Sequence, residues 1–173
     1  MYAVTLHPRP WSLKRAQVGE YINHLGIPDA AGVFSAWEQH TPVEETPYRY
    51  MKYAKTILRR GVAGSSRAWA QPVGMRLEIV PQSDPTAVTA GGTIDVLVLD
   101  GGKPLAGHPI SMLRAGGGEP FTAVTAPDGR ASLRVSAPGP YLIRATRLEP
   151  SADSAFVWDV HFTTLTFEAA GAR

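Results

Sequence analysis

Alternating apolar and polar residues fill the second half of the chain and predict short β-strands. Seven such runs, separated by Gly, Pro and Asp, lie at 76–80, 93–99, 108–114, 121–125, 131–135, 139–147 and 156–167, the last one interrupted. Pro127-Asp128-Gly129 and Asp100-Gly101-Gly102 predict turns, because Asp bonds back to the chain and Gly adopts positive φ. The pattern indicates a mainly β fold with a seven-strand Greek-key β-sandwich over residues 74–173.

The first part of the chain shows a different spacing, which predicts helices after one leading strand. Residues 2–6 alternate as a strand. Val18, Tyr21, Ile22 and Leu25 are spaced i, i+3, i+4 and i+7, which predicts a helix capped by Ser12 and ended by Gly26. A short helix is expected within 29–40. We therefore expect residues 1–73 to form a helical segment with a leading strand, placed before the sandwich.

A further helix is predicted over residues 47–60. Tyr50, Ala54, Ile57 and Leu58 form an apolar stripe at helical spacing. Thr46 can act as the N-cap, and Gly61 follows the last turn. Arg49 and Lys52 would lie on the polar face, which we interpret as the solvated side of a docked helix and not as a nucleic-acid surface.

Composition and charge exclude several classes of function. The chain has 44% hydrophobic and 18% charged residues, as folded proteins do, and its net charge of +2 creates no strong field for nucleic acid. The absence of Cys rules out disulfides and thiolate catalysis. Apolar runs such as Ile94–Leu99 are too short to span a membrane, and residues 1–6 lack the features of a signal peptide.

Several segments, in order along the chain, carry a family resemblance. They are Tyr21-Ile22-Asn23-His24-Leu25-Gly26, Tyr48-Arg49-Tyr50-Met51-Lys52-Tyr53-Ala54-Lys55, Leu77-Glu78-Ile79-Val80-Pro81, Asp84-Pro85, Gly102-Lys103-Pro104-Leu105, Thr125-Ala126-Pro127-Asp128-Gly129-Arg130, Phe156-Val157-Trp158 and Thr164-Leu165-Thr166-Phe167-Glu168. Together the chain resembles an uncharacterised family of exported bacterial proteins, which carries the label of a nickel-uptake or cobalt–nickel-transport-associated periplasmic domain. The sandwich also resembles transthyretin-like and carboxypeptidase-regulatory domains.

The resemblance implies a periplasmic location, a preceding β-domain and an N-terminal His that binds metal. The present sequence has neither that first domain nor its leading His, so we expect residues 1–73 to be a remnant of, or linker from, such a domain. The resemblance also implies that the protein serves transition-metal uptake, with Ni or Co as the ion.

Apart from the family resemblance, the residue pattern itself offers two candidates for metal binding. Asp159 and His161 are two positions apart on a predicted strand, so their side chains share one face and can hold a divalent ion together. A third ligand would come from another segment; His7, His24, His40 and His108 are the remaining imidazoles. The alternative is that both residues lie on a solvated strand face.

The aromatic residues of the first segment are candidates for binding a partner. We expect a protein partner or a second copy to contact the helical segment through Trp11, Phe34, Trp37, Tyr50 and Tyr53. The alternative is that these residues are packing anchors. No nucleophile elbow is present, and Gly116-Gly117-Gly118 precedes a strand, which indicates a hairpin loop and not a phosphate-binding loop.

Three functions remain open at this point. The first is a non-enzymatic periplasmic binding or accessory module associated with uptake of a metal such as nickel or cobalt. The second is a structural adaptor of a larger cell-envelope assembly. The third is an enzyme acting on a small molecule or glycan with its site on loops, which the lack of catalytic motifs disfavours.

Overall fold

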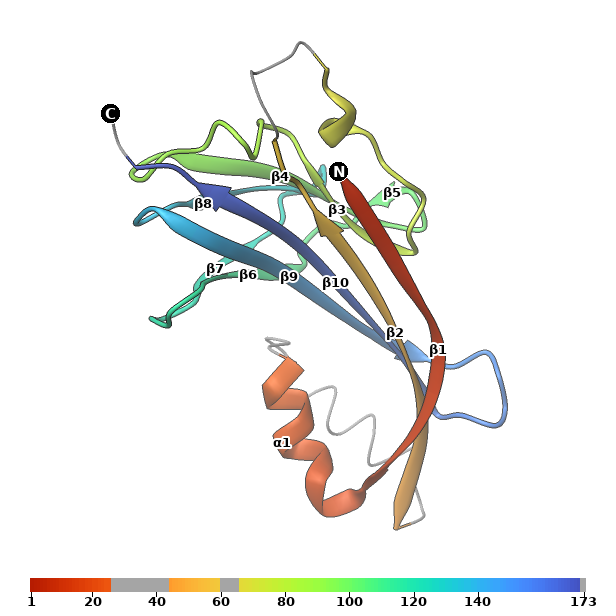
Figure 1. Ribbon diagram of the computed structural model, residues 1–173. Helices are drawn as coiled ribbons and strands as arrows, with labels where there is room; N and C mark the ends of the chain where they lie inside the picture. Colours follow the sequence, from red (N-terminus) through yellow and green to blue (C-terminus); the bar gives the residue numbers. More distant parts are fainter. Residues whose placement is uncertain (26–43, 60–65, 172–173) are drawn as a thin grey trace. The chain divides into compact units, whose positions relative to one another are not determined.

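The computed structural model describes residues 1–25, 44–59 and 66–171, and these form a mainly β protein with two sheets (Figure 1). The elements are β1 (Tyr2–Lys14), α1 (Arg15–Leu25), β2 (Glu45–Thr56), a 3-10 turn η1 (Ala68–Ala70), β3 (Leu77–Pro81), β4 (Thr93–Asp100), β5 (Lys103–Pro104), β6 (Pro109–Arg114), β7 (Phe121–Val124), β8 (Arg130–Arg134), β9 (Gly139–Pro150) and β10 (Trp158–Ala169). The predicted β-sandwich is therefore correct in its coarse form.

The larger sheet has six strands in the order β1-β2-β10-β9-β6-β7, so β1 and β7 form its edges. The strands β6 and β9 are antiparallel, with Leu113 opposite Leu142 and Ser111 opposite Arg144. The hairpin β6–β7 is antiparallel as well, and its loop contains Gly116, Gly117 and Gly118. The hairpin interpretation of this glycine run is confirmed.

The smaller sheet is built around β4. β3 pairs with it along one side, and β5 and β8 pair with successive parts of its other side, all antiparallel. The predicted turn at Pro127-Asp128-Gly129 leads into β8. Gly129 has φ of 77°, and a Cβ there would lie 2.9 Å from the Val98 carbonyl oxygen, so only glycine fits.

The described residues form two compact units, each made of separate segments. Unit 1 comprises Met1–Thr5, Tyr53–Ala145 and Thr163–Arg173, and unit 2 comprises Leu6–Lys52 and Thr146–Phe162. The predicted boundary at residue 74 is not a point at which the chain passes from one unit to the other.

Unit 1 contains the interior of the sandwich. Its fully buried side chains come from both sheets: Leu77, Ile79, Ile94, Val96, Val98, Leu133, Ile143 and Leu165. The burial of alternate residues along β4 and β9 is the pattern expected when each strand places one face against the opposing sheet.

Unit 2 has its own apolar core beneath α1. Val18, Ile22 and Leu25 of α1 are buried together with Leu13, Tyr48, Trp158 and Val160. The predicted helix over this segment is confirmed, but its predicted cap is wrong. Ser12 lies within β1, and the Gln17 side chain instead reaches back to the backbone N–H of Lys14 at 3.3 Å, which satisfies a donor at the helix start.

The helix predicted over 47–60 is also wrong, because this segment forms strand β2. Its alternation of period two competes with the helical spacing: Met51, Tyr53, Lys55 and Ile57 are buried, whereas Lys52 and Ala54 between them are exposed. Tyrosine favours strands, and pairing with β1 and β10 decides the outcome.

Three further predictions concern the number of strands, the helix within residues 29–40 and the lack of a membrane-spanning segment. The seven predicted strands all occur, but with β1, β2 and β5 the described residues hold ten, so a seven-strand Greek key is not confirmed. The predicted helix within 29–40 lies outside the described residues. Within the described ranges, no helix has the length and apolar character needed to cross a membrane.

Candidate functional site

The two residues predicted to bind metal lie on β10, and each has a partner in the protein. Asp159 accepts hydrogen bonds from Arg49 Nε at 2.8 Å and Arg49 Nη2 at 2.6 Å. His161 Nε2 donates to Glu149 Oε1 at 3.2 Å, since a carboxylate can only accept. Asp159 and His161 are 8% and 6% exposed, so the predicted solvated strand face is not what surrounds them.

Arg49 organises this charged cluster of unit 2. Its guanidinium also contacts Asp153 at 3.2 Å and Ser151 at 3.1 Å, and it lies over the ring of Phe156 at 5.2 Å. Ser151, Asp153 and Phe156 belong to the loop between β9 and β10. Arg49 therefore fastens this loop to β2 through several directed contacts at once.

The pKa of Asp159 is shifted by opposing effects. Burial alone would raise the pKa of this carboxyl, but hydrogen bonds from Arg49 and Ser151 and the charges of Arg49 and His161 lower it below its usual value. The hydrogen bond to Asp159 in turn raises the pKa of Arg49. Asp159 is thus an ionised carboxylate whose charge Arg49 balances.

The contacts of Asp159 and His161 within the protein affect whether these residues can bind a metal ion. Within 1–25, 44–59 and 66–171, no group of three or more His, Asp or Glu side chains is placed to hold a metal ion. An ion at Asp159 would compete with the bidentate bonds from Arg49, and Arg repels a cation. Metal binding by Asp159 and His161 stays a prediction.

The residues predicted to bind a partner have very different surroundings. Trp11 is 61% exposed on β1, whereas Tyr53 is only 7% exposed. Tyr50 is partly buried against the core of unit 2, and Lys52 lies over its ring at 5.3 Å. Phe34 and Trp37 lie outside the described residues.

Unit 1 contains a buried ion pair, Lys55 with Glu78, that was not predicted from the sequence. Lys55 Nζ donates to Glu78 Oε1 and, at 3.2 Å, to the Ile79 carbonyl oxygen. The Glu78 carboxylate also accepts the backbone N–H groups of Val73, Gly74 and Met75 at 2.7 to 3.0 Å. Both side chains are 1% exposed, so a ligand cannot reach this pair, and its role is to hold β2 and β3 together.

The pKa of Lys55 reflects that position. Burial lowers the pKa of its amine, and the hydrogen bond and charge of Glu78 oppose that shift. The ion pair of Lys55 and Glu78 was not predicted because residues 47–60 were interpreted as a helix. Read as a strand, the same segment places Lys55 on the buried side with Met51 and Tyr53, and a buried lysine requires an acidic partner.

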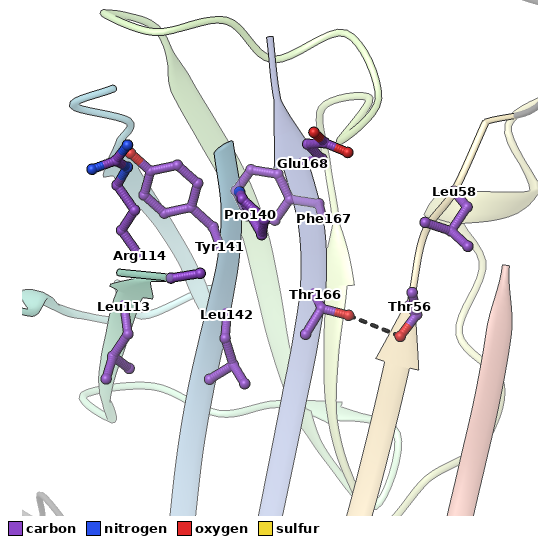
Figure 2. Close-up of a pocket in the computed structure, with 11 residues that line it drawn as sticks. Thr56, Leu58, Leu113, Arg114, Pro140, Tyr141, Leu142, Thr166, Phe167 and Glu168 are labelled. Atoms are coloured by element: carbon purple, nitrogen blue, oxygen red, sulfur yellow. Dashed lines mark hydrogen bonds between the residues drawn. The ribbon is translucent and has the colours of Figure 1, made fainter. Parts of the chain in front are cut away.

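The best candidate for a binding site is an apolar groove on unit 1, with a volume of about 480 Å³ (Figure 2). It crosses β6, β9, β10 and the end of β2. The lining residues are Thr56, Leu58, Leu113, Arg114, Ala115, Pro140, Tyr141, Leu142, Thr166, Phe167 and Glu168. The groove could not be predicted from the sequence, because its residues come from four separate segments and none is chemically distinctive.

The groove combines a mainly apolar surface with two charged side chains, Arg114 and Glu168. Leu113 and Leu142 are directly opposite each other on β6 and β9 and are both partly exposed, and Leu58 is 61% exposed. The hydroxyl groups of Thr56 and Thr166 form a hydrogen bond of 2.8 Å with each other, so a ligand need not supply a hydrogen-bond partner for them. The groove is therefore suited to covering apolar groups.

Its two charges lie on different sides. Arg114 lies on the β6 side, and Glu168 lies on the β10 side with Leu58 beyond it (Figure 2). Arg114 is held in place because its Nε and Nη2 donate to the Pro138 carbonyl oxygen at 3.2 and 3.0 Å. An occupant that carries an acidic and a basic group on either side of apolar groups would match this distribution.

Two solved structures are similar to the chain. The D0-D1 domain of Intimin matches with 24% identity and a TM-score of 0.30 over 54% of this chain and 46% of that one. The PKD domain of the human VPS10 domain-containing receptor SorCS2 matches with 16% identity and a TM-score of 0.36 over 69% of this chain and 98% of that one. At such TM-scores these likenesses carry no weight for fold or function.

The curated proteins contain no match to the chain. A family model does match, and it covers residues 2–149, which span β1 through nearly all of β9. The chain thus belongs to the DUF4198 family, a domain of unknown function.

Proposed function

We propose that the protein is a non-enzymatic binding module that holds an apolar segment of a protein partner in the groove of unit 1. The observation that carries this proposal is the groove itself, which has a volume of about 480 Å³ and a mainly apolar lining that includes Leu58, Leu113 and Leu142. Enclosing such side chains removes apolar surface from water, which is a main source of affinity in recognition of peptides by proteins.

A peptide segment fits the charges better than a simple amphiphile. A fatty-acid anion would be attracted by Arg114 and repelled by Glu168, whereas a peptide can place an acidic residue beside Arg114 and a basic residue beside Glu168. We therefore expect the occupant to have two or three apolar side chains between charges of opposite sign.

The wider setting is part of the same proposal. The resemblance of the segments described above to exported proteins supports a periplasmic accessory role, in which the module serves as an adaptor of an envelope assembly. An association with nickel or cobalt uptake rests on that resemblance alone. Calorimetric titration with Ni²⁺, Co²⁺ and Zn²⁺ tests it, and the absence of heat with all three would end the metal part.

The experiment for the groove is a selection of peptides. A phage-displayed library is selected on the immobilised full chain, and the enriched peptides are then tested for binding to Leu58→Asp, which places a charge in the groove at an exposed position and so leaves the fold intact. We expect enriched peptides to share apolar residues flanked by opposite charges. Peptides that bind Leu58→Asp as well as the unchanged chain would contradict the proposal.

A matched control separates the groove from general surface effects. Val124 is 63% exposed, which is close to the 61% of Leu58, and it does not line the groove. Val124→Asp should bind the selected peptides as the unchanged chain does. Glu168→Lys should weaken the peptides that carry a basic residue on that side, because the charge they contact is reversed.

A further inference from the structure

Strand β1 gathers exposed apolar side chains at an edge of the larger sheet. Five exposed large apolar residues lie between positions 1 and 11: Met1, Tyr2, Val4, Leu6 and Trp11, at 43% to 69% exposure. Among the strands of the described residues, β2 is its one neighbour in the sheet (Figure 1). An apolar edge strand of this length is a template for pairing with another strand.

The two prolines of β1 show which backbone groups face outward. Pro8 and Pro10 have no N–H to donate, and a proline within a paired strand directs its nitrogen away from the neighbouring strand. The backbone groups of residues two apart point the same way in an antiparallel strand. The N–H and C=O groups of Tyr2, Val4 and Leu6 therefore face away from β2, while Pro8 and Pro10 block pairing farther along.

The segment from Tyr2 to Leu6 is complementary to itself. Antiparallel pairing about Val4 places Val4 opposite Val4 of a second copy and Tyr2 opposite Leu6. The segment Tyr2-Ala3-Val4-Thr5-Leu6 contains no charged side chain, so no like charges meet. Cross-strand pairs of aromatic and aliphatic or of two β-branched residues are favourable, and such pairing is closed by a two-fold axis.

From this geometry we propose that residues 2–6 of β1 pair with the same residues of a second copy, forming a symmetric dimer with a continuous sheet. This contact is independent of the groove, because no residue of 2–6 lines it. The dimer does not rest on the proposed function, and each can fail without the other.

The first test uses a cysteine at the two-fold axis. The chain has no cysteine, so Val4→Cys introduces the only thiol. Directly opposed residues of a hydrogen-bonded pair lie about 5.5 Å apart between Cα atoms, within the range that a disulfide spans. On mild oxidation Val4→Cys should form a covalent dimer on a non-reducing gel. Ser12→Cys, exposed on the same strand but far from the axis, should stay monomeric.

The second test removes the outward hydrogen bond. Val4→Pro deletes an N–H that faces away from β2, as Pro8 and Pro10 already do, so the strand keeps its place in the sheet. Sedimentation equilibrium should show a dimer for the unchanged chain and for Val4→Thr, and a dissociation constant raised by about tenfold or more for Val4→Pro. Circular dichroism confirms that all three are folded.

Two results would overturn the dimer. One is an unchanged chain that sediments as a monomer at millimolar concentration, which would leave the edge to a strand of a different protein. The other is a dimer that persists in Val4→Pro or that crosslinks equally through Ser12→Cys, which would place the contact elsewhere on the molecule.

Discussion

Each unit contains an ion pair that joins distant segments, and the two pairs differ in their surroundings. Lys55 and Glu78 in unit 1 are 1% exposed, and the carboxylate also receives three backbone N–H groups. The side chains of Arg49 and Asp159 in unit 2, taken without their backbone atoms, are 24% and 12% exposed. Water can solvate part of the second pair but cannot enter the first, so the same kind of bond has different consequences in the two units.

The largest effect is expected from breaking the buried pair. Lys55→Ala leaves the Glu78 carboxylate without its balancing charge in the interior of the sandwich, and such a change costs about 3–5 kcal/mol. Urea unfolding followed by circular dichroism measures it. Lys52→Ala, an exposed lysine on the same strand, is the control and should cost about 1 kcal/mol or less. Equal losses for both variants would refute the distinction.

A smaller effect is expected in unit 2. Asp159→Asn removes the charge that accepts both bonds from Arg49, and hydrogen bonds to charged groups contribute about 1.5–3 kcal/mol. Asp153→Asn removes another carboxylate that contacts the Arg49 guanidinium. Because the Asp153 side chain is 45% exposed, the loss of unfolding free energy should be smaller than for Asp159→Asn. A cost for Asp153→Asn above that of Asp159→Asn would show that Arg49 depends mainly on the loop.

The smallest effect is the pH dependence of that second pair. The pKa of Asp159 is lower in the folded chain than in the unfolded one, so its stabilising contribution is complete above its ordinary pKa and is lost as pH falls through the folded value. The difference in unfolding free energy between the unchanged chain and Asp159→Asn should hold from pH 7 to about 5 and shrink below about 4. A difference that grows on acidification would contradict this.

The burial pattern of the long strand β10 shows where residue alternation is a poor guide to the fold. In unit 1 the buried residues of β10 are odd-numbered, such as Leu165 and Phe167, whereas in unit 2 Trp158 and Val160 are buried in the core with α1. Asp159 and His161 are buried as well, so the first part of β10 is covered on both faces and lacks the single alternation seen in its later part. All seven predicted strands occur. The alternation that predicts them corresponds to the burial of every second residue most clearly in β4 and β6.

The candidate site was less accessible to sequence reasoning. The proximity of Asp159 and His161 within one strand could be predicted, but the partners Arg49 and Glu149 come from β2 and β9 and depend on strand order. The same holds for Leu58, Leu113 and Leu142, which are ordinary aliphatic residues until the pairing of β6 with β9 and the segment after β2 bring them into one groove. Long-range pairing, not local propensity, determines both sites.

The most direct test of a binding role is a titration of a selected peptide into three forms of the chain. Calorimetry should give equal affinities for the unchanged chain and Val124→Asp, and an affinity weaker by about tenfold or more for Leu58→Asp. Affinities that fall equally in Leu58→Asp and Val124→Asp, or in neither, would contradict the assignment of the groove as the binding site.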